Sequence, residues 1–458
     1  MATTALNAEQ LEALATACSG TLLEPTDDAY EEARRVHNGL IDKRPAVIVR
    51  CRGAADVADA IRFARAEGLE ISVRGGGHNV AGRAVSDGGL MIDLAEMKGI
   101  RVDPAARTVR AQGGVTWAEL NREAAFHGLA VTGGQVSTTG VAGFTLGGGL
   151  GWLMGLHGLA VDNLLSIELV TADGEVLDVD ADSHPDLFWA LRGGGGNFGV
   201  ASSLEFRLHP VGEVIGGLLA YPFDAAGDLL RFYRDYTRDT PDALTIHGVL
   251  AHAPDGSGLE LAALGICHAG TPDEAERDLA PVRAFGSPIL DALGPMPYPA
   301  VNAMLDAGYP RGALSYWKSS FLHELDDGFI DEAVARFSET PSTMNAILIE
   351  QFHGAGTRIP VTETAVAQRE PGYNLLLPST WLDPADTEAN IAWTRETYEA
   401  LRPYSGERRW LNYLDDDDGG DAVRAAYGPN YDRLLEVKRR YDPENVFHLN
   451  HNLDPSSG

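Results

Sequence analysis

Glycine is concentrated in three short clusters in the first half of the chain, and these clusters restrict the fold more than any other feature of the sequence. They lie at residues 75–77, 147–151 and 193–196. Glycine loses more conformational freedom on folding than any other residue, so such clusters persist where the backbone turns tightly or approaches a ligand closely. Tight turns explain any single cluster equally well. Three clusters together favour a long cofactor, polyanionic or planar, that is threaded between backbone segments.

The third cluster continues into GGGNFG at residues 194–199, which matches the dinucleotide-binding fingerprint GxGxxG. That fingerprint requires a strand before it and a helix after it, so that the pyrophosphate meets the N-terminus of the helix. Here a helical pattern at 186–192 precedes the glycines and a strand pattern at 200–206 follows them. The inverted order argues against a Rossmann site, while contact between the loop backbone and a phosphate stays open.

The pattern of apolar residues changes near residue 211 and predicts two folding units. A chain of 458 residues exceeds the size at which a single hydrophobic core usually keeps growing. Residues 1–211 alternate short strand patterns with helical ones. Residues 212–410 carry longer alternating strands, such as 244–253, with helices between them, which is typical of an α+β unit on an antiparallel sheet. We therefore expect an α+β protein with two domains, followed by a C-terminal segment at 411–458.

Charge and cysteine content argue against several classes of partner. The 36 basic and 66 acidic residues give a formal net charge of −30, whereas nucleic acids and anionic membranes require clustered basic side chains. No apolar run approaches the roughly 18 residues of a membrane span, and the N-terminus lacks the pattern of a secretory signal, so a cytoplasmic enzyme is expected. Cys18, Cys51 and Cys267 are odd in number and far apart, so we expect no disulfide framework and no metal. The acidic run at 415–421 is most simply an exposed loop.

Five segments together resemble the berberine bridge enzyme branch of the vanillyl-alcohol oxidase / p-cresol methylhydroxylase flavoprotein superfamily. They are RGGGHNVAG (74–82), TTGVAGFTLGGGLGWL (138–153), HGLAVDNLL (157–165), HPDLFWALRGGGGNFGV (184–200) and YDPENVFHLNHNLDP (441–455). The resemblance is weak in the middle of the chain. It implies a two-domain flavoprotein in which a PCMH-type FAD-binding domain is completed by the C-terminal segment and the antiparallel-sheet domain binds the substrate.

The resemblance also implies how FAD is held. His78 matches the histidine that is bonded to the 8α-methyl carbon of the flavin; a loop histidine that caps a turn is the alternative. Val136 stands where many members carry a cysteine that forms a second bond, so we expect FAD to be attached covalently through His78 only. The remaining implied contacts are Arg74, Gly75, Gly76, Gly77, Asn79, Gly82, Val136, Ser137, Thr138, Thr139, Gly140, Gly143, Asp162, Asn163, Gly199, Val200, Asn450 and Asn452. For the two tail asparagines, ordinary turn chemistry is the alternative.

The resemblance implies fewer residues for catalysis than for cofactor binding. Glu350, in the apolar stretch NAILIEQF, matches a glutamate that acts as base, and burial would raise its pKa towards neutrality. A glutamate at a sheet edge that faces solvent explains the pattern equally well. Trp410 replaces the tyrosine of the YxN motif that sugar and polyketide oxidases of the family carry. Tyr413 and Tyr373 are the other candidates, although alternation along a strand would place Tyr413 on the face opposite Trp410 and Asn412.

The expected reaction transfers a hydride from a C–OH or C–NH carbon of a small, secondary-metabolite-like substrate to the flavin, after which O2 reoxidises the flavin and yields hydrogen peroxide. An oxygenating enzyme is the first alternative, because Val136 and Thr139 could line a small apolar oxygen pocket. A non-catalytic, flavin-holding protein is the second. The substrate is not encoded in a recognisable pattern, because specificity belongs to the middle domain, and no pattern indicates an oligomeric state.

Overall fold

The first sheet lies in the N-terminal part of the computed structural model, which describes residues 6–457. Its strand order is β1-β2-β4-β3, with β3 and β2 parallel to β4. Helix α3 connects β2 to β3 and buries Val57, Ala60, Ile61 and Ala64, which recur at helical spacing, before it ends at Gly68 in the left-handed conformation. The elements are α1 (Ala8–Ala17), β1 (Thr21–Leu23), α2 (Tyr30–Ala33), β2 (Val47–Arg50), α3 (Ala54–Glu67), β3 (Ile71–Arg74) and β4 (Leu90–Asp93). The first glycine cluster follows directly after β3.

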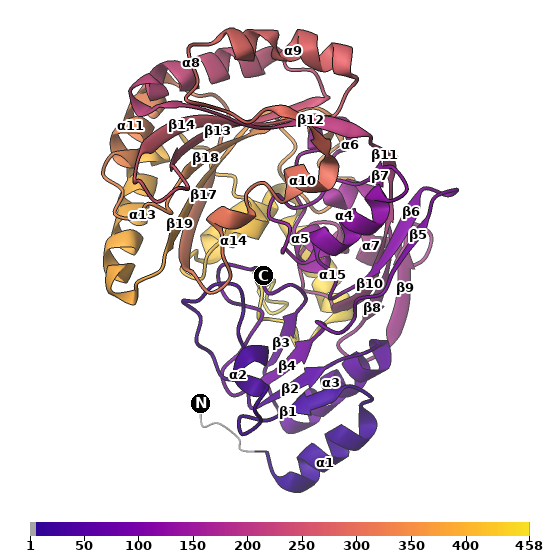
Figure 1. Cartoon of the computed structure of the whole chain (residues 1–458). Helices are drawn as coiled ribbons and strands as arrows, with labels where there is room; N and C mark the ends of the chain where they lie inside the picture. The colour runs from indigo at the N-terminus through magenta and orange to yellow at the C-terminus, as the bar shows by residue number, and fades with distance from the viewer. Residues whose placement is uncertain (1–5, 458) are drawn as a thin grey trace.

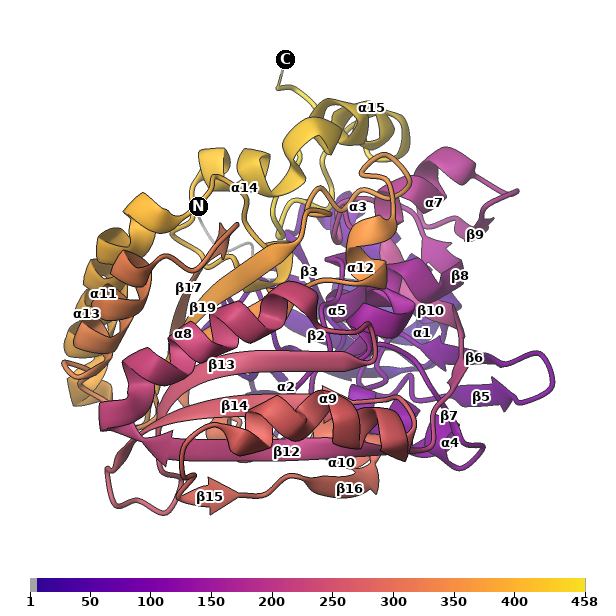
Figure 2. The same cartoon turned by 90° about the horizontal axis from the view of Figure 1, so that it is seen from above.

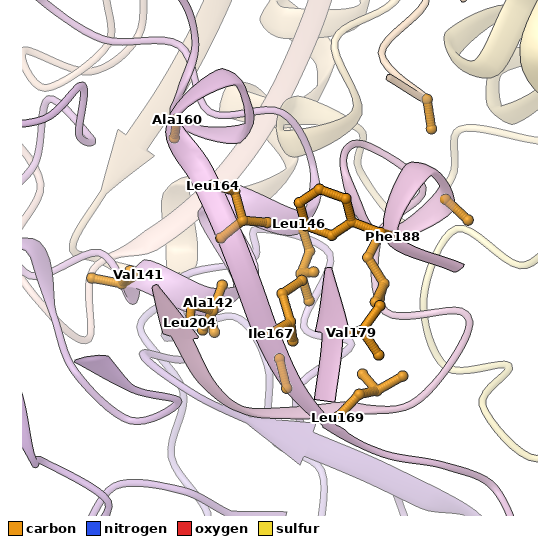
Figure 3. Packing of buried hydrophobic residues seen from close by; sticks show 14 of the residues in the cluster. Val141, Ala142, Leu146, Ala160, Leu164, Ile167, Leu169, Val179, Phe188 and Leu204 are labelled. Atoms are coloured by element: carbon orange, nitrogen blue, oxygen red, sulfur yellow. The ribbon is translucent and has the colours of Figure 1, made fainter. Parts of the chain in front are cut away.

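The second sheet is antiparallel and carries the other two glycine clusters on its connections. Its order is β5-β6-β10-β8-β9, and β7 pairs separately with β11. Figure 3 shows Leu146 and Phe188 among the buried side chains around the strand that carries Leu164 and Ile167. The elements are β5 (Ile100–Asp103), β6 (Thr108–Gln112), α4 (Trp117–Ala125), β7 (Leu129–Ala130), α5 (Val141–Leu146), α6 (Met154–His157), β8 (Leu164–Val170), β9 (Val176–Asp180), α7 (Pro185–Leu191), β10 (Val200–Arg207) and β11 (His209–Pro210).

The middle of the chain forms one large sheet, and every strand pair in it is antiparallel. The order is β15-β12-β14-β13-β18-β19-β17, and β16 also pairs with β12. The strands are β12 (Glu213–Pro222), β13 (Leu244–His252), β14 (Glu260–His268), β15 (Leu290–Asp291), β16 (Gly294–Pro297), β17 (Leu314–Leu322), β18 (Ile347–Phe352) and β19 (Gly372–Trp381). The α+β fold class predicted from the sequence is thereby confirmed.

The longer helices of this region cover the outer face of the large sheet. Figure 1 shows α8, α9, α11 and α13 on its outer side, and Figure 2 shows α8 and α9 lying across β12, β13 and β14. Along β18, Ile347 and Ile349 belong to the core under these helices. Leu348 and Glu350 alternate with them and face inwards, towards the glycine loops. The helices of this region are α8 (Ala226–Tyr236), α9 (Pro272–Ala284), α10 (Tyr298–Asn302), α11 (Asp327–Phe337), α12 (Ala355–Arg358) and α13 (Thr387–Leu401).

The C-terminal segment packs against the third glycine cluster. It contains α14 (Gly420–Tyr427) and α15 (Tyr431–Tyr441). The fully buried Lys438 donates hydrogen bonds to the carbonyls of Asn197 and Phe447 and forms an ion pair with Asp442 at 2.7 Å. The Asn197 side chain in turn accepts a hydrogen bond from the Leu453 amide. The last residues are therefore tied to the loop between α7 and β10.

The structure corrects the expectation that the acidic run at 415–421 is simply an exposed loop. Asp415 is only 6% exposed and accepts a hydrogen bond from the backbone amide of Trp317. The amino group of Lys318 lies 2.6 Å from Asp417 and 2.7 Å from Asp418. The carboxylates at 415, 417 and 418 therefore fasten this turn to β17, because a buried lysine requires paired charges.

Between residues 6 and 457 no helix is long and apolar enough to cross a membrane. The three cysteines are buried and free. In the same range, no group of three or more His, Cys, Asp or Glu side chains could hold a metal ion.

Candidate flavin and substrate site

A cavity lies between the glycine loops of the N-terminal region and the inner face of the large sheet. Glu350 and Tyr413, two of the predicted catalytic residues, line it, together with Leu348 and Leu376 of the sheet. The predicted cofactor residues that line it are Gly75, Gly76, Gly77, His78, Asn79, Val136, Thr139, Gly140, Gly143, Gly199, Val200 and Asn450. The structure therefore brings the first and third glycine clusters and the C-terminal tail to one place, and Gly147 of the second cluster joins them there.

Glycine is required in these loops for two different reasons. A Cβ atom on Gly76 would lie 2.3 Å from the backbone nitrogen of Gly140, so the two loops pack backbone against backbone. Gly77 has a φ of 69°, a left-handed conformation that glycine adopts without strain. In contrast, a Cβ atom on Gly143 or Gly196 would meet no described atom within 4 Å, and both residues line the cavity. Backbone in these two stretches is therefore accessible to a bound group.

His78 lies at the cavity wall between two neighbours. Its Nε2 atom is 2.7 Å from the hydroxyl of Thr138, and its ring stacks on His37 with a centroid separation of 3.7 Å. Burial, together with the nearby His37, lowers the pKa of His78 to about 3. The imidazole is therefore neutral at physiological pH and keeps a lone pair available for bonding.

Buried polar atoms around the cavity fit a bound polar cofactor. Asn450 Oδ1 and Arg83 Nε are buried and have no hydrogen-bond partner among the described residues, and both residues line the cavity. Such orphaned atoms are rare in folded proteins and usually indicate a bound group or water. The cavity therefore fits FAD, because it offers accessible backbone at the glycines, a neutral histidine and buried polar atoms without a partner.

Glu350 is fully buried in the interior of the large sheet, since β18 lies between β13 and β19. The alternative of a solvent-facing glutamate at a sheet edge is therefore wrong. Asn374 donates a hydrogen bond to Glu350 Oε2 at 2.7 Å, and the Tyr413 hydroxyl donates to Oε1 at 3.2 Å. Burial raises the pKa of Glu350 to about 7, although these hydrogen bonds and one from Gln135 oppose the rise.

Tyr413 reaches Glu350 because residues 410–413 do not form a strand. Leu411–Tyr413 form a short 3-10 turn, η7, so the expected strand alternation does not apply. Trp410 packs in an apolar cluster with Phe352. Asn412 lines the cavity and donates a hydrogen bond to the carbonyl of Phe144. Burial and the adjacent Glu350 raise the pKa of Tyr413 well above 10, so its phenol is a hydrogen-bond donor at neutral pH.

Tyr373, the third candidate catalytic residue, faces away from the cavity. Tyr373 pairs with Gln351, whereas its neighbour Asn374 pairs with Glu350, so the two successive side chains lie on opposite faces of the sheet. The Tyr373 hydroxyl lies 2.6 Å from the hydroxyl of Thr237, and its ring belongs to the core under the helices. The structure therefore removes Tyr373 from the site.

Several predicted cofactor contacts support the loops and do not line the cavity. Arg74 pairs with Asp93 beneath the first glycine cluster. Asp162 forms an ion pair with Arg369 at 2.8 Å, and both side chains are nearly buried. The Ser137 amide and hydroxyl both donate to Asp306. The members of this group are Arg74, Gly82, Ser137, Thr138, Asp162, Asn163 and Asn452; of these, Thr138 touches His78 directly.

Other residues of the site were missed by sequence reasoning. The Gln135 amide nitrogen lies 2.9 Å from His247 Nε2, and burial lowers the pKa of His247 to about 3. Tyr309 and Trp317 line the cavity beside Tyr413. Gln135 directly precedes Val136 and could have been suspected from the motif. The others carry no local signal, since their positions depend on strand pairing and on the packing of the middle domain.

Comparison with known proteins agrees with this geometry. Residues 45–180 match the FAD binding domain family, and residues 410–454 match the family described as berberine and berberine like. The chain is 32% identical over 456 residues to (R)-6-hydroxynicotine oxidase of Paenarthrobacter nicotinovorans, covering 95% of this chain and 97% of the relative. It is 30% identical over 416 residues to an FAD-linked oxidoreductase of Dictyostelium discoideum, covering 90% and 89%.

A solved structure extends the likeness to the fold. The crystal structure of 6-hydroxy-D-nicotine oxidase from Arthrobacter nicotinovorans matches with a TM-score of 0.88 at 31% identity, over 96% of this chain and 98% of the other. The sequence identity, the fold and the residues that line the cavity therefore indicate the same family. The chain belongs to the berberine bridge enzyme-like family of FAD-linked oxidoreductases, as the resemblance of its motifs predicted.

Proposed function

We propose that the protein is an FAD-dependent oxidase that removes a hydride from the carbon of a C–OH or C–NH group in a small molecule, with O2 as acceptor and hydrogen peroxide as product. The observation that carries this proposal is the burial of Glu350 in the cavity that the glycine loops line. Bound FAD supplies the hydride acceptor for such a reaction. The protein's own residues bind the substrate, exclude water and accept the proton.

Glu350 is the proposed general base. With a pKa of about 7, a substantial fraction of the protein carries the carboxylate at neutral pH, and a base is most effective when its pKa lies near the working pH. Asn374 and Tyr413 each bond one carboxylate oxygen and so fix the orientation of the group. Tyr413 serves as this donor and not as the base, because its pKa is far too high.

An anaerobic screen tests the oxidase proposal. The purified holoenzyme is mixed without oxygen with amines, phenolic alcohols and sugars, and flavin bleaching is followed; air is then admitted and peroxide is measured. Glu350→Gln should slow bleaching by the best substrate about 100-fold or more, the usual contribution of a positioned base. Equal bleaching rates in the variant and the wild type would remove Glu350 from the mechanism.

The flavin is attached through His78 alone in this proposal. His78 is neutral, faces the cavity and has its Nε2 atom held by Thr138, while Val136 offers no sulfur for a second bond. After acid precipitation, the wild-type pellet should stay yellow, and the pellet of His78→Ala should be colourless. A wild-type pellet that loses its colour would contradict covalent attachment. Mass spectrometry of the peptide that contains His78 gives an independent readout.

A second candidate is an oxygenating reaction on the same site. It is favoured by Val136 and Thr139, which line the same cavity as His78 and whose methyl groups suit a small apolar molecule such as O2. Labelled O2 distinguishes the two reactions, because an oxygenase incorporates the label in the product whereas an oxidase releases it as peroxide. A purely flavin-holding role is set aside, since the chain belongs to a family of oxidoreductases.

A further inference from the structure

Glu350 lies in a row of side chains that runs across the inner face of the large sheet. His247 of β13 is its direct partner on one side, and Asn374 of β19 is its direct partner on the other. Directly opposed residues of antiparallel strands point to the same face, with their Cβ atoms about 4.5–5.5 Å apart. Asn374 donates a hydrogen bond to the carboxylate. His247 does not bond Glu350 directly among residues 6–457, and its polar contact is with Gln135.

The Gln135 amide connects these two side chains. Its nitrogen lies 2.9 Å from His247 Nε2, and the same side chain donates a hydrogen bond to the Glu350 carboxylate. An amide nitrogen can only donate, and an ionised carboxylate can only accept. One N–H of Gln135 therefore points to His247 and the other points to Glu350, and the His247 ring carries its own proton on Nδ1.

The His247 ring is held in one place and kept neutral. It packs against Trp152 with 4.6 Å between the ring centroids. Gly265, its partner on β14, makes room for the indole, since a Cβ atom there would lie 3.3 Å from a ring carbon of Trp152. Burial, together with the nearby His353, lowers the pKa of His247 to about 3. Its Nε2 atom is therefore an acceptor at neutral pH.

We propose that His247 is a positioning residue for the base: by accepting one N–H of Gln135, it directs the other N–H to the Glu350 carboxylate. A glutamine side chain has several rotamers, and two partners together select the one that reaches the carboxylate. A hydrogen bond to the charged form of an acid stabilises that form and lowers the pKa. The pair His247–Gln135 thus offsets part of the rise that burial causes. This inference rests on the proposed role of Glu350 as base.

The other ionisable groups around Glu350 keep their charge state near neutral pH. Burial and the adjacent carboxylate raise the pKa values of Tyr309 and Tyr413 above 10. Burial lowers the pKa values of His78 and His451, which line the same cavity, to about 3. The remaining charged side chain of the cavity wall is the guanidinium of Arg83, which stays protonated. A change in the titration of Glu350 therefore reports on its own hydrogen bonds.

Infrared difference spectra of the holoenzyme, recorded across pH, measure the titration of Glu350 without a substrate. The band of its protonated carboxyl group is the one that Glu350→Gln lacks. Gln135→Leu removes the amide and should move the titration midpoint up by about one pH unit, the worth of one hydrogen bond to a charged group. His247→Phe keeps a ring against Trp152 but offers no acceptor, and should move the midpoint up by about half a unit or more. The double variant should move it no further than Gln135→Leu alone, because the histidine acts through the amide.

Two further variants separate positioning from packing. His247→Gln places an amide oxygen near the position of Nε2 and should return the midpoint close to the wild-type value. His252→Phe makes the same change on the same strand, but the His252 ring contacts Phe337 under the helices, so the midpoint should stay unchanged. Where His247→Phe does not fold, His247→Leu takes its place in the comparison.

An unchanged midpoint in Gln135→Leu or in His247→Phe, or a shift that His247→Gln does not reverse, overturns the inference. Its failure is distinguishable from failure of the proposed function, because the carboxyl titration requires no turnover. A shifted titration with an unshifted pH profile of flavin reduction keeps the positioning pair and removes Glu350 as the base. An unshifted titration, in a protein that Glu350→Gln slows, removes the positioning pair and keeps the base.

Discussion

The Glu350 carboxylate is completely buried, and its protonation state should control the rate of flavin reduction. The groups that face it are Asn374 from β19, Tyr413 from η7, Gln135 from the loop before α5 and, behind Gln135, His247 from β13. His247 titrates near pH 3 and Tyr413 far above pH 10. Among these groups, only Glu350 changes charge near neutrality. Because a protonated carboxyl cannot accept a proton, kcat/KM should rise through about pH 7. A stopped-flow pH profile of flavin reduction measures this, and a profile that is flat from pH 5.5 to 8.5 would contradict it.

The buried Glu350 carboxylate should also make the folded protein less stable as the pH rises. Burial raises the pKa of Glu350 from 4.5 to about 7, so between these pH values the folded protein holds a proton that the unfolded chain releases. Stability therefore falls as pH rises through this window, by about 3 kcal/mol when complete. Glu350→Gln, which keeps the shape but not the charge, should melt at a higher temperature than wild type at pH 8 and at nearly the same temperature at pH 5. A difference in melting temperature that does not depend on pH would refute this explanation.

At the level of strands, the amino-acid sequence predicts which side chains share a face but not which face meets the ligand. The period-2 pattern of 347–352 places Ile349 and Glu350 on opposite faces, but it cannot tell which face meets the ligand, because helices bury one face and the glycine loops the other. The sequence likewise does not show that Tyr373 faces the helices while its neighbour Asn374 holds Glu350. Strand alternation predicts the wrong face for Tyr413 because the turn Leu411–Tyr413 contains no glycine or proline to indicate it.

At the level of elements, the turn at 415–418 should depend on Lys318. This side chain is 7% exposed and bonds both Asp417 and Asp418. Lys318→Met would leave Asp418 without an ion-pair partner and Asp417 with only the exposed Arg395, at a cost of about 1–3 kcal/mol. We expect a lower melting temperature and faster proteolysis within this turn. Arg395→Met removes the exposed partner of the same Asp417 and should cost at most about 1 kcal/mol. Equal effects of the two variants would show that the buried lysine is not the fastening residue.

At the scale of the whole molecule, sequence motifs indicate the cofactor site but not the substrate site. The glycine clusters indicate a long cofactor from the amino-acid sequence alone, because close backbone approach leaves a local trace in the sequence. The resemblance of the His78 motif and the other segments to a known family is what identifies this cofactor as FAD. The substrate end leaves no such trace. Tyr309, Trp317 and Glu350 come from separate parts of the middle domain and meet only through tertiary packing. Residue patterns therefore predicted the cofactor better than the substrate.

Closure of the cofactor cavity should depend on a residue far from the chemistry. Lys438, fully buried on α15, joins the last residues to the third glycine loop through the Asn197 carbonyl, the Phe447 carbonyl and Asp442. Lys438→Met would leave Asp442 buried and unpaired, a loss of about 3–5 kcal/mol, and would free the tail that carries Asn450 to the cavity. We therefore expect purified Lys438→Met to hold much less flavin per chain than wild type, measured by absorbance after denaturation. Arg440→Met, which removes an exposed charge from the same helix, should retain its flavin. Full flavin content in Lys438→Met would show that the tail closes the cavity without this anchor.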